Sequence, residues 1–244
     1  MKAIITGHTR GLGAALAVEL LGRDMPVLAL ARHRDDALAA RFPARLEQVQ
    51  VDLADSAALA SWLAGDALAR FAADAEALLL INNAGVLGPI GPLAGQDADG
   101  IARAVCVNVT APLMLSSALA RAHSGALRII HISSGAARAA YSGWSIYCAT
   151  KAALDHHARA VALDGDANIR VCSLAPGVID TDMQAEIRAT STALFPMQDK
   201  FLALKRDGLL ATAQDVAARL VSHALSKDFG AEPVGDLRNL PGAG

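Results

Sequence analysis

Short apolar segments recur along the chain, each bounded by turn residues and separated from the next by a stretch long enough for a helix. Continuous apolar runs of this kind are typical of parallel strands that are buried on both faces. Because parallel strands need crossover connections, which are usually helices, the alternation predicts an α/β fold with one doubly wound parallel sheet and helices on both faces. The predicted strands are residues 3–5, 27–31, 46–51, 78–81, 127–132 and 169–174.

The length of 244 residues fits one α/β domain, and no linker, repeat or low-complexity run divides the sequence. We therefore predict a single domain over residues 1–244. The most irregular stretch is 180–208, where Pro196 interrupts the helical pattern. This stretch follows the end of a predicted strand, where ligands bind in open α/β sheets, so we expect it to form a small substrate lid.

Composition and charge exclude several kinds of partner. A net charge of −2 with both signs mixed gives no basic stripe for nucleic acid and no cationic face for a membrane. The longest uninterrupted apolar runs, such as 77–81, are far shorter than the roughly 18 residues that a bilayer-spanning segment needs. The opening MKAIITG runs directly into a predicted strand and leaves no room for a signal peptide. We therefore expect a cytoplasmic chain whose partner is a small molecule.

The cysteines and histidines indicate neither a disulfide framework nor a metal site. The cysteines are odd in number, far apart and set in apolar surroundings. His131 and the His156-His157 pair lack further ligands nearby in the sequence. We therefore predict that no metal is bound. The cysteines are Cys106, Cys148 and Cys172.

A glycine-rich segment, ITGHTRGLGAAL at residues 5–16, follows the first predicted strand and opens the first predicted helix. Gly7, Gly11 and Gly13 would let the backbone turn tightly and approach a pyrophosphate, which free N–H groups at the helix N-terminus would hold. The alternative is a glycine turn that binds nothing. The flanking strand and helix favour a dinucleotide site.

The choice between NAD and NADP is expected at the end of the second strand, in VLALARHRDD. An acidic residue there would bind the ribose 2′-hydroxyl of NAD, whereas arginine accommodates the 2′-phosphate of NADP. Ala31 stands at the expected acidic position, Arg32 follows it, and Arg10 comes from the glycine loop. Two guanidiniums could clamp a phosphate dianion, which favours NADPH. Alternatively, both arginines are solvated surface charges.

Two further strand ends offer cofactor contacts. Asp52 follows the third strand and could accept a hydrogen bond from the adenine amine, or it could cap the helix that follows. The sequence NNAG follows the fourth strand, where small residues allow the middle of the cofactor to approach the backbone. The alternative for this segment is a plain asparagine turn. The cofactor-binding candidates in it are Asn83, Ala84 and Gly85.

Tyr147 and Lys151 lie four residues apart in SIYCATKAAL, a spacing that places them on one face of a helix. Such a pair is often an exposed amphipathic pair. The neighbours Cys148, Ala152 and Leu154 make this helix too apolar for that interpretation, which favours a buried functional pair.

The order of these motifs resembles that of the short-chain dehydrogenase/reductase family. TGHTRGLG, NNAG, Asn108, Ser134, the Tyr147–Lys151 pair and Pro176-Gly177 occur in register over nearly the whole chain. GWSIYCATKAA and NIRVCSLAPGVIDTDMQ are most similar to the sepiapterin reductase branch and to bacterial diketone (benzil) reductases. The chain lacks the VDGG-type ending of acyl-carrier ketoreductases, which argues against a fatty-acid role without excluding it. The resemblance implies a Rossmann-type sheet of about seven strands.

The family resemblance implies a catalytic set and further contacts with NADP(H). Tyr147 would act as acid or base, with its pKa drawn toward working pH by the Lys151 ammonium and the oxidised nicotinamide. Ser134 would bond the same substrate oxygen; its neighbour Ser133 competes for this role, and the family spacing selects Ser134. Lys151 would hold the nicotinamide ribose, and Asn108, in a helical segment over 101–123, would anchor a proton-relaying water. The remaining implied cofactor contacts are Thr9, Leu12, Leu53, Pro176, Gly177, Val178 and Thr181.

Trp144, Met183 and Gln184 are the predicted substrate-binding residues, together with Ser134 and Tyr147. Apolar walls and a flat ring suit a planar or aromatic carbonyl compound. By resemblance, Asp236 aligns with a C-terminal aspartate that anchors the pterin ring in sepiapterin reductases, although a capping or surface aspartate is an equal alternative.

These features predict an NADPH-dependent carbonyl reductase of a vicinal dicarbonyl, either a sepiapterin-like pterin side chain or an aromatic diketone. The alternatives are an NADP(H)-binding sensor or regulator with little turnover, and a ketoreductase for another substrate such as a 3-oxoacyl thioester. The resemblance also implies a homodimer or a tetramer, assembled through helices at 101–123 and 145–163.

Overall fold

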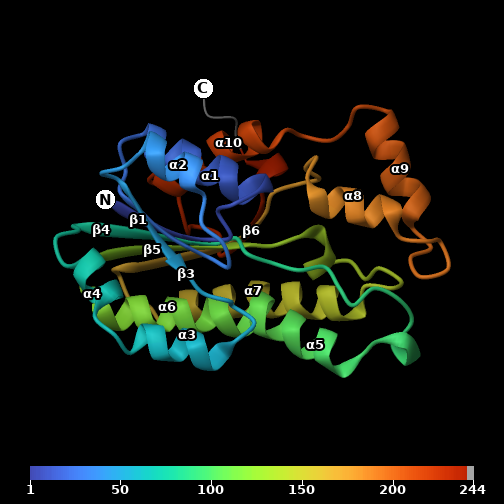
Figure 1. Cartoon of the computed structure of the whole chain (residues 1–244), viewed down its shortest axis with the longest axis horizontal. Helices are drawn as coiled ribbons and strands as arrows, with labels where there is room; N and C mark the ends of the chain where they lie inside the picture. The colour runs from blue at the N-terminus through green and yellow to red at the C-terminus, as the bar shows by residue number, and fades with distance from the viewer. Residues whose placement is uncertain (241–244) are drawn as a thin grey trace.

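Seven parallel strands form one sheet in the order β3-β2-β1-β4-β5-β6-β7 in the computed structural model, which describes residues 1–240 (Figure 1). The six strands expected from the apolar runs are confirmed within a residue or two at each end, and β7 completes the sheet of about seven strands. One sheet thus takes strands from near both ends of the described chain. The single domain over residues 1–244 stays a prediction, and residues 241–244 lie outside the described part. The strands are β1 (Lys2–Thr6), β2 (Val27–Ala31), β3 (Leu46–Gln50), β4 (Ala77–Asn82), β5 (Ala126–Ile132), β6 (Ile169–Ala175) and β7 (Val234–Asp236).

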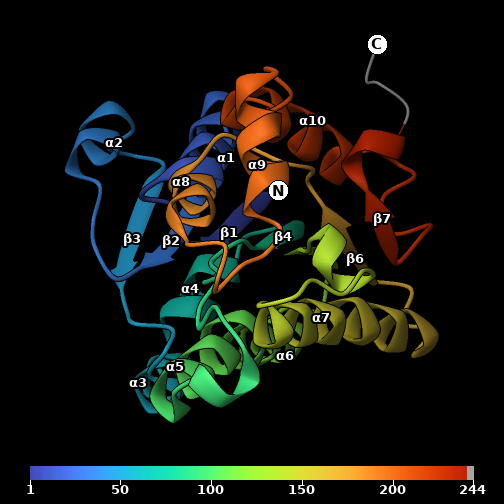
Figure 2. The same cartoon turned by 90° about the vertical axis from the view of Figure 1, so that its right-hand side faces the viewer.

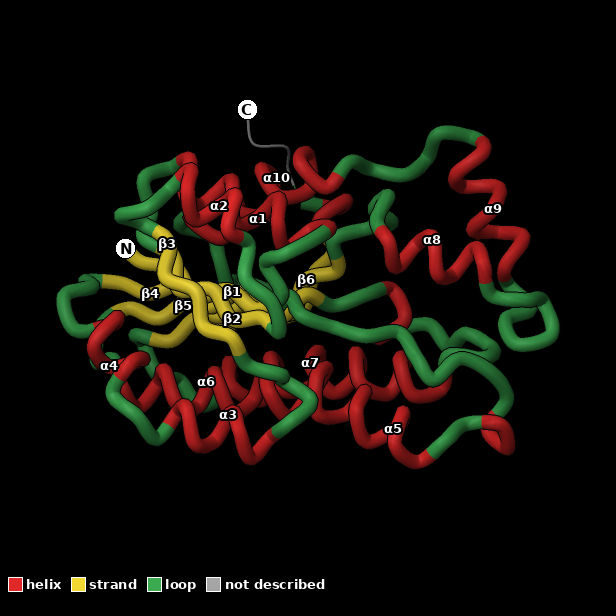
Figure 3. The backbone as a smooth tube through the Cα atoms, in the orientation of Figure 1, coloured by secondary structure: helices red, strands yellow, loops and turns green. Residues whose placement is uncertain are grey.

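Helices cover both faces of the sheet, and Figure 3 shows the strands as a layer between them. On one face, α1 (Gly11–Gly22) packs against α10 (Ala213–Leu225), and α2 (Asp36–Arg41) lies on the same side of the sheet (Figure 1). Leu16, Leu20 and Leu220 are fully buried there. The other face carries α3 (Ser56–Leu63), α4 (Ala67–Ala72), α5 (Ala98–Val105), α6 (Ala111–Ala122) and α7 (Ser145–Leu163). Short 3₁₀ turns at Leu93–Gly95, Gly135–Ala137 and Leu237–Asn239 are η1, η3 and η4.

The helix predicted over 101–123 is one helical stretch with a π-helical segment, η2 (Cys106–Thr110), between α5 and α6. The whole stretch, Ala98–Ala122, is long and apolar enough to cross a membrane by length and composition alone. The sequence argument considered only uninterrupted apolar runs and missed it. In the structure α6 lies on the sheet with Leu115 and Leu119 fully buried, so packing in the core accounts for its apolar side chains.

Two helices, α8 (Asp182–Ala189) and α9 (Gln198–Arg206), form the segment predicted as a lid at 180–208. In Figure 2 they lie toward the viewer, beyond the carboxyl ends of the strands. The base of this segment is closed by paired backbone bonds, in which Asp180 donates to the Ala211 carbonyl and Ala211 donates to the Val178 carbonyl, both at 3.0 Å. These bonds place the lid over the edge of the sheet where β5 and β6 end.

Candidate active site

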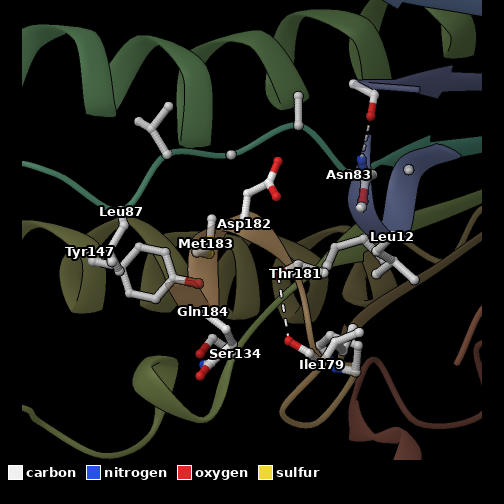
Figure 4. Close-up of a pocket in the computed structure, with 18 of the residues that line it drawn as sticks. Leu12, Asn83, Leu87, Ser134, Tyr147, Ile179, Thr181, Asp182, Met183 and Gln184 are labelled. Atoms are coloured by element: carbon white, nitrogen blue, oxygen red, sulfur yellow. Dashed lines mark hydrogen bonds between the residues drawn. The ribbon is translucent and has the colours of Figure 1, made fainter. Parts of the chain in front are cut away.

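A cavity of about 840 Å³ lies where β1, β2, β4, β5 and β6 end, under the lid (Figure 4). The strand order changes direction between β1 and β4, and doubly wound sheets bind ligands at such a point. All predicted cofactor residues line the cavity, whereas Asn108 and Asp236 among the predicted site residues do not. The cofactor candidates are Gly7, Thr9, Arg10, Gly11, Leu12, Gly13, Arg32, Asp52, Leu53, Asn83, Ala84, Gly85, Tyr147, Lys151, Pro176, Gly177, Val178 and Thr181.

The glycine loop has the shape that a bound pyrophosphate requires. Gly7 and Gly11 adopt left-handed backbone angles, with φ of 72° and 54°, which favour glycine. The N-cap of α1 is Arg10, whose side chain makes no capping hydrogen bond, so the first N–H groups of the helix are available to an anion. The Asn83 amide donates to the carbonyls of Thr6 and Gly7 at 2.9 and 3.1 Å and holds the loop in place. The chain therefore fits a dinucleotide here.

Gly13→Ala is expected to destabilise the glycine loop. An added Cβ would lie 1.9 Å from the Gly7 carbonyl oxygen and 2.5 Å from Nδ2 of Asn83, so the backbone must shift. Overpacking of this kind typically costs about 1–3 kcal/mol, and the displaced loop should also bind NADPH more weakly. Denaturant unfolding and NADPH titration measure both effects. Gly22→Ala is the control, because nothing lies within 4 Å of its added Cβ; equal behaviour of the two variants would contradict the close approach.

Arg32 and Arg10 lie on the cavity wall at the end of β2 and in the glycine loop. Within residues 1–240, no carboxylate forms an ion pair with Arg32, whereas Arg10 lies 3.6 Å from Oδ2 of Asp182 on the lid. Both members of that pair are more than 70% exposed, so water weakens their attraction. Two guanidiniums therefore remain able to bind a phosphate at this wall.

Asp52 does not cap the helix that follows it, so that alternative is wrong. Asp55 caps α3 instead, accepting the N–H of Ala58 at 2.9 Å. Asp52 accepts the N–H of Ala54 at 3.0 Å and lies 3.8 Å from Arg103 on α5. Arg103 also lines the cavity, and no sequence motif pointed to it.

Tyr147 and Lys151 are buried on one face of α7, with 7% and 4% of their surface exposed. The alternative of an exposed amphipathic pair is therefore wrong. Lys151 Nζ donates to the Ile132 carbonyl at 2.7 Å and lies 5.7 Å from the centre of the Tyr147 ring. Ser134 lies two residues beyond the end of β5, and its Oγ accepts the N–H of Ala136 at 3.1 Å. Figure 4 shows Ser134 and Tyr147 at one end of the cavity.

Burial dominates the electrostatics of this pair. It raises the pKa of Tyr147 to about 12, although the hydrogen bond with Ser134 acts in the opposite direction. Burial also lowers the pKa of Lys151 to about 8, against the raising effect of Asp155. In the chain alone, burial therefore holds the pKa of Tyr147 above its ordinary value. The expected lowering by Lys151 together with the oxidised nicotinamide stays a prediction.

Asn108 lies in the π-helical segment η2 and is 1% exposed. Its Oδ1 accepts the N–H of Val86 at 2.8 Å, and its Nδ2 donates to the Val86 carbonyl at 2.8 Å and to the Thr150 hydroxyl at 3.1 Å. The side chain thus ties the loop after β4 to α7. A Cβ on Gly85 would lie 3.4 Å from Asn108 Oδ1 and 3.5 Å from Lys151 Nζ, so this loop runs between them. The water-anchoring role stays a prediction.

The part of the cavity beside Tyr147 is aromatic. Trp144 stacks on Phe195 of the lid, with ring centres 4.4 Å apart and 7° between planes, and meets Tyr147 edge-on at 5.6 Å. Phe201 on α9 packs against both Trp144 and Phe195 at 5.5 Å. The two phenylalanines were missed because they lie in the irregular segment, where no motif or periodicity marks them.

Met183 and Gln184 come from the first turn of α8 and line the same end of the cavity. Gln184 is 7% exposed, and its buried Oε1 has no hydrogen-bond partner among the residues that the structure describes. Buried polar atoms are nearly always paired, so this amide is available to a ligand.

Asp236 has the capping role that the sequence left open. It accepts the N–H of Arg238 at 3.0 Å at the start of η4 and the Arg238 side chain at 2.9 and 2.7 Å. The Arg238 guanidinium lowers the pKa of the carboxyl. Arg238, rather than Asp236, lines the cavity, where its Cδ would lie 3.4 Å from a Cβ on Gly177. The predicted contact of Asp236 with the substrate therefore has a competing partner in place.

Among residues 1–240, no group of three histidine, cysteine, aspartate or glutamate side chains could hold a metal ion.

The family model for the short chain dehydrogenases matches residues 1–192. Benzil reductase ((S)-benzoin forming) of Bacillus cereus is 31% identical over 93% of this chain and 94% of its own length. Sepiapterin reductase of Meriones unguiculatus is 33% identical over 92% of this chain and 91% of its own length. Among solved structures, a short-chain dehydrogenase/reductase from Burkholderia vietnamiensis is 51% identical over 98% of both chains, with a TM-score of 0.72.

A short chain dehydrogenase from Burkholderia cenocepacia, solved in complex with NADP, is 30% identical over 96% of this chain and 94% of its own, with a TM-score of 0.77. The matched region contains the glycine loop, Ser134, Tyr147, Lys151 and the start of the lid. Together with the sheet order and the cavity, these similarities identify the chain as an oxidoreductase that belongs to the short-chain dehydrogenase family.

Proposed function

We propose that the chain is an NADPH-dependent reductase that converts one carbonyl group of a vicinal dicarbonyl compound to an alcohol. The observation that carries this proposal is the buried Tyr147–Lys151 pair beside Ser134, at the aromatic end of a cavity whose other end is the glycine loop. The printed name of the benzil reductases supports the substrate class, because benzil carries two adjacent carbonyl groups.

The residues that would hold NADPH follow from the cavity wall. The N-terminus of α1 would bind the pyrophosphate, Arg10 and Arg32 the 2′-phosphate, Asp52 the adenine amine and Lys151 the nicotinamide ribose. When bound, the nicotinamide supplies hydride to the carbonyl carbon.

Tyr147 donates the proton in the reducing direction. With its pKa at about 12, the phenol stays protonated at neutral pH and can give its proton to the carbonyl oxygen as negative charge develops there. Ser134 donates a hydrogen bond to the same oxygen and orients it. The phenolate that remains is stabilised by the Lys151 ammonium, which lies next to the ring.

Gln184 supports the choice of a dicarbonyl over a simple ketone. Its amide lines the cavity at the end that holds Ser134 and has a buried oxygen without a partner in the described chain. The unpartnered oxygen is an acceptor, so it is the N–H donors of the same amide that could bind the second carbonyl oxygen of the substrate. Trp144, Phe201 and Met183 supply apolar walls for a flat or aromatic substituent.

We expect wild-type protein to reduce benzil and sepiapterin with NADPH, and Gln184→Leu to lose more activity on benzil than on deoxybenzoin, which lacks the second carbonyl oxygen. Loss of one hydrogen bond predicts about a two- to tenfold larger fall in kcat/KM for the diketone. Initial rates of NADPH oxidation give kcat/KM for each compound with the wild type and with Gln184→Leu. The ratio of variant to wild type, taken for each compound separately, cancels the intrinsic reactivity of that compound. The compound with the higher kcat/KM, benzil or sepiapterin, indicates whether the chain prefers the diketone or the pterin.

The control is Gln214→Leu, the same change at an exposed position on α10 that does not line this cavity. Equal losses on both ketones in Gln184→Leu would contradict the second-oxygen contact. Tight NADPH binding without turnover on any of these compounds would instead support the sensor, or a ketoreductase for a different substrate such as a 3-oxoacyl thioester.

Assembly and location belong to the same proposal. A homodimer through 101–123 and 145–163 is supported by two exposed apolar side chains on these helices, Val105 at 40% and Leu163 at 87% exposure. A cytoplasmic location suits a reductase that takes NADPH from the cell. Both stay predictions.

A further inference from the structure

Asp155 is a carboxylate buried on α7 that the sequence motifs did not mark. It is 2% exposed and lies one turn beyond Lys151, on the face of the helix that carries Tyr147 and Lys151. Burying a charged group is unfavourable unless other groups pair with it, so its partners indicate what it does.

The partners of Asp155 come from the strands that end at the cavity. Its Oδ1 accepts the hydroxyls of Ser133, which follows β5, and Ser173 on β6, at 2.6 and 2.7 Å. Its Oδ2 lies 3.6 Å from Nε of Arg138, just after η3, and has no hydrogen bond in the described part of the chain. Arg138 in turn donates to the Gly235 carbonyl on β7 at 3.2 Å.

These contacts hold the segment that leads from β5 into the cavity. Lys151 bonds the Ile132 carbonyl, Asp155 bonds the Ser133 hydroxyl, and Ser134 comes next. Two consecutive turns of α7 therefore fix two consecutive residues of the segment that ends at Ser134. A shift of this segment would move Ser134 relative to Tyr147.

We propose that Asp155 is a positioning residue: its carboxylate fixes Ser134 through Ser133, and its negative charge stabilises the ammonium of Lys151. The part of this proposal that concerns turnover rests on the proposed reductase function. The part that concerns Lys151 is a property of the folded chain alone and can be tested without cofactor.

Among the titratable groups in and around the Lys151–Asp155 pair, Lys151 is the one that changes charge in the folded chain between pH 8 and pH 10. The phenol and the buried thiol both have a pKa of about 12, and the buried imidazole has a pKa of about 3. The guanidinium is permanently charged. These groups are Tyr147 and Asp155 on α7, His131 on β5, Cys172 on β6 and Arg138 after η3.

The sign of the expected pH dependence follows from the lowered pKa of Lys151. Its pKa is about 8 in the folded chain and near 10.5 when unfolded, so the cost of burying the ammonium is full below pH 8 and is lost as the pH rises toward 10.5. Removing the Asp155 charge increases this cost only while Lys151 is protonated. The loss of hydrogen bonds to Ser133 and Ser173 costs the same at every pH in this range.

In cofactor-free protein, Asp155→Asn is therefore expected to lower the urea midpoint more at pH 7 than at pH 10. In a Lys151→Met background the same substitution should give a loss that does not depend on pH. Asp164→Asn, an identical change at the exposed C-cap of α7, is the control and should leave the midpoint nearly unchanged. A pH-independent loss in the wild-type background would reduce Asp155 to a structural role and overturn the electrostatic part of the proposal.

With benzil and NADPH, Asp155→Asn is expected to lower kcat about tenfold, with KM for NADPH within about twofold, and to move the alkaline limb of the rate profile to lower pH. Ser133→Ala should lower kcat without moving that limb, because it removes the link to Ser134 and keeps the charge. Wild-type kcat in both variants would overturn the positioning role. If wild-type protein reduces no dicarbonyl, the proposed function fails, and the unfolding experiment still decides whether Asp155 supports Lys151.

Discussion

Tyr147→Phe is expected to lower kcat for dicarbonyl reduction by about 10²- to 10⁴-fold, the range that a positioned general acid contributes. The phenol is the proposed acid, and burial keeps it protonated at neutral pH. Phenylalanine retains the ring that meets Trp144 edge-on, so the fold and the NADPH affinity should change little. Single-turnover rates and NADPH titration separate the chemical step from binding.

The chain offers a matched control in its second tyrosine. Tyr141 also lines the cavity, with Lys200 over its ring at 5.6 Å, but it lies in the loop before α7 rather than beside Lys151. Tyr141→Phe removes the same hydroxyl group and is expected to change kcat less than about threefold. Similar losses in the two variants, or turnover in Tyr147→Phe close to wild type, would assign proton donation to another group.

The parts of the fold that were predictable from the sequence depend on local patterns. Apolar runs between turn residues marked β1 to β6, because a strand buried on both faces needs apolar residues at every position. The helix predicted over 145–163 matches α7 at both ends. Tyr147 and Lys151 were found for the same reason, since a spacing of four residues fixes two side chains on one helical face.

The features that the sequence could not predict depend on contacts between distant segments. Asp55 rather than Asp52 caps α3, a choice that turns on where the helix begins, and boundaries are the weakest part of any pattern. Phe195 reaches Trp144 only through the fold of the lid. The pKa of Tyr147 depends mainly on how completely the phenol is buried, which the spacing of residues in the sequence does not show.

The combined variant Arg10→Ala and Arg32→Ala is expected to lower kcat/KM with NADPH about 10²-fold and to leave kcat/KM with NADH nearly unchanged. Charge-assisted hydrogen bonds contribute about 1.5–3 kcal/mol each, and the lower value applies because Arg10 is largely exposed, so each guanidinium accounts for roughly tenfold. NADH has no 2′-phosphate, so it loses none of these bonds. Initial rates with NADPH and with NADH at low ionic strength give the ratio of the two kcat/KM values in the variant and in the wild type.

Arg34→Ala is the control, because Arg34 lies two residues beyond Arg32, pairs with Asp36 at 3.7 Å and does not line the cavity. Ala31→Asp tests the same wall in the opposite direction. Ala31 ends β2 and is 7% exposed, so a carboxylate there would repel the 2′-phosphate and could accept the ribose hydroxyl of NADH. NADPH preference should fall in this variant as well. If the double variant weakens both cofactors equally, the arginines bind the pyrophosphate or support the lid, and the preference for NADPH must come from another part of the cavity.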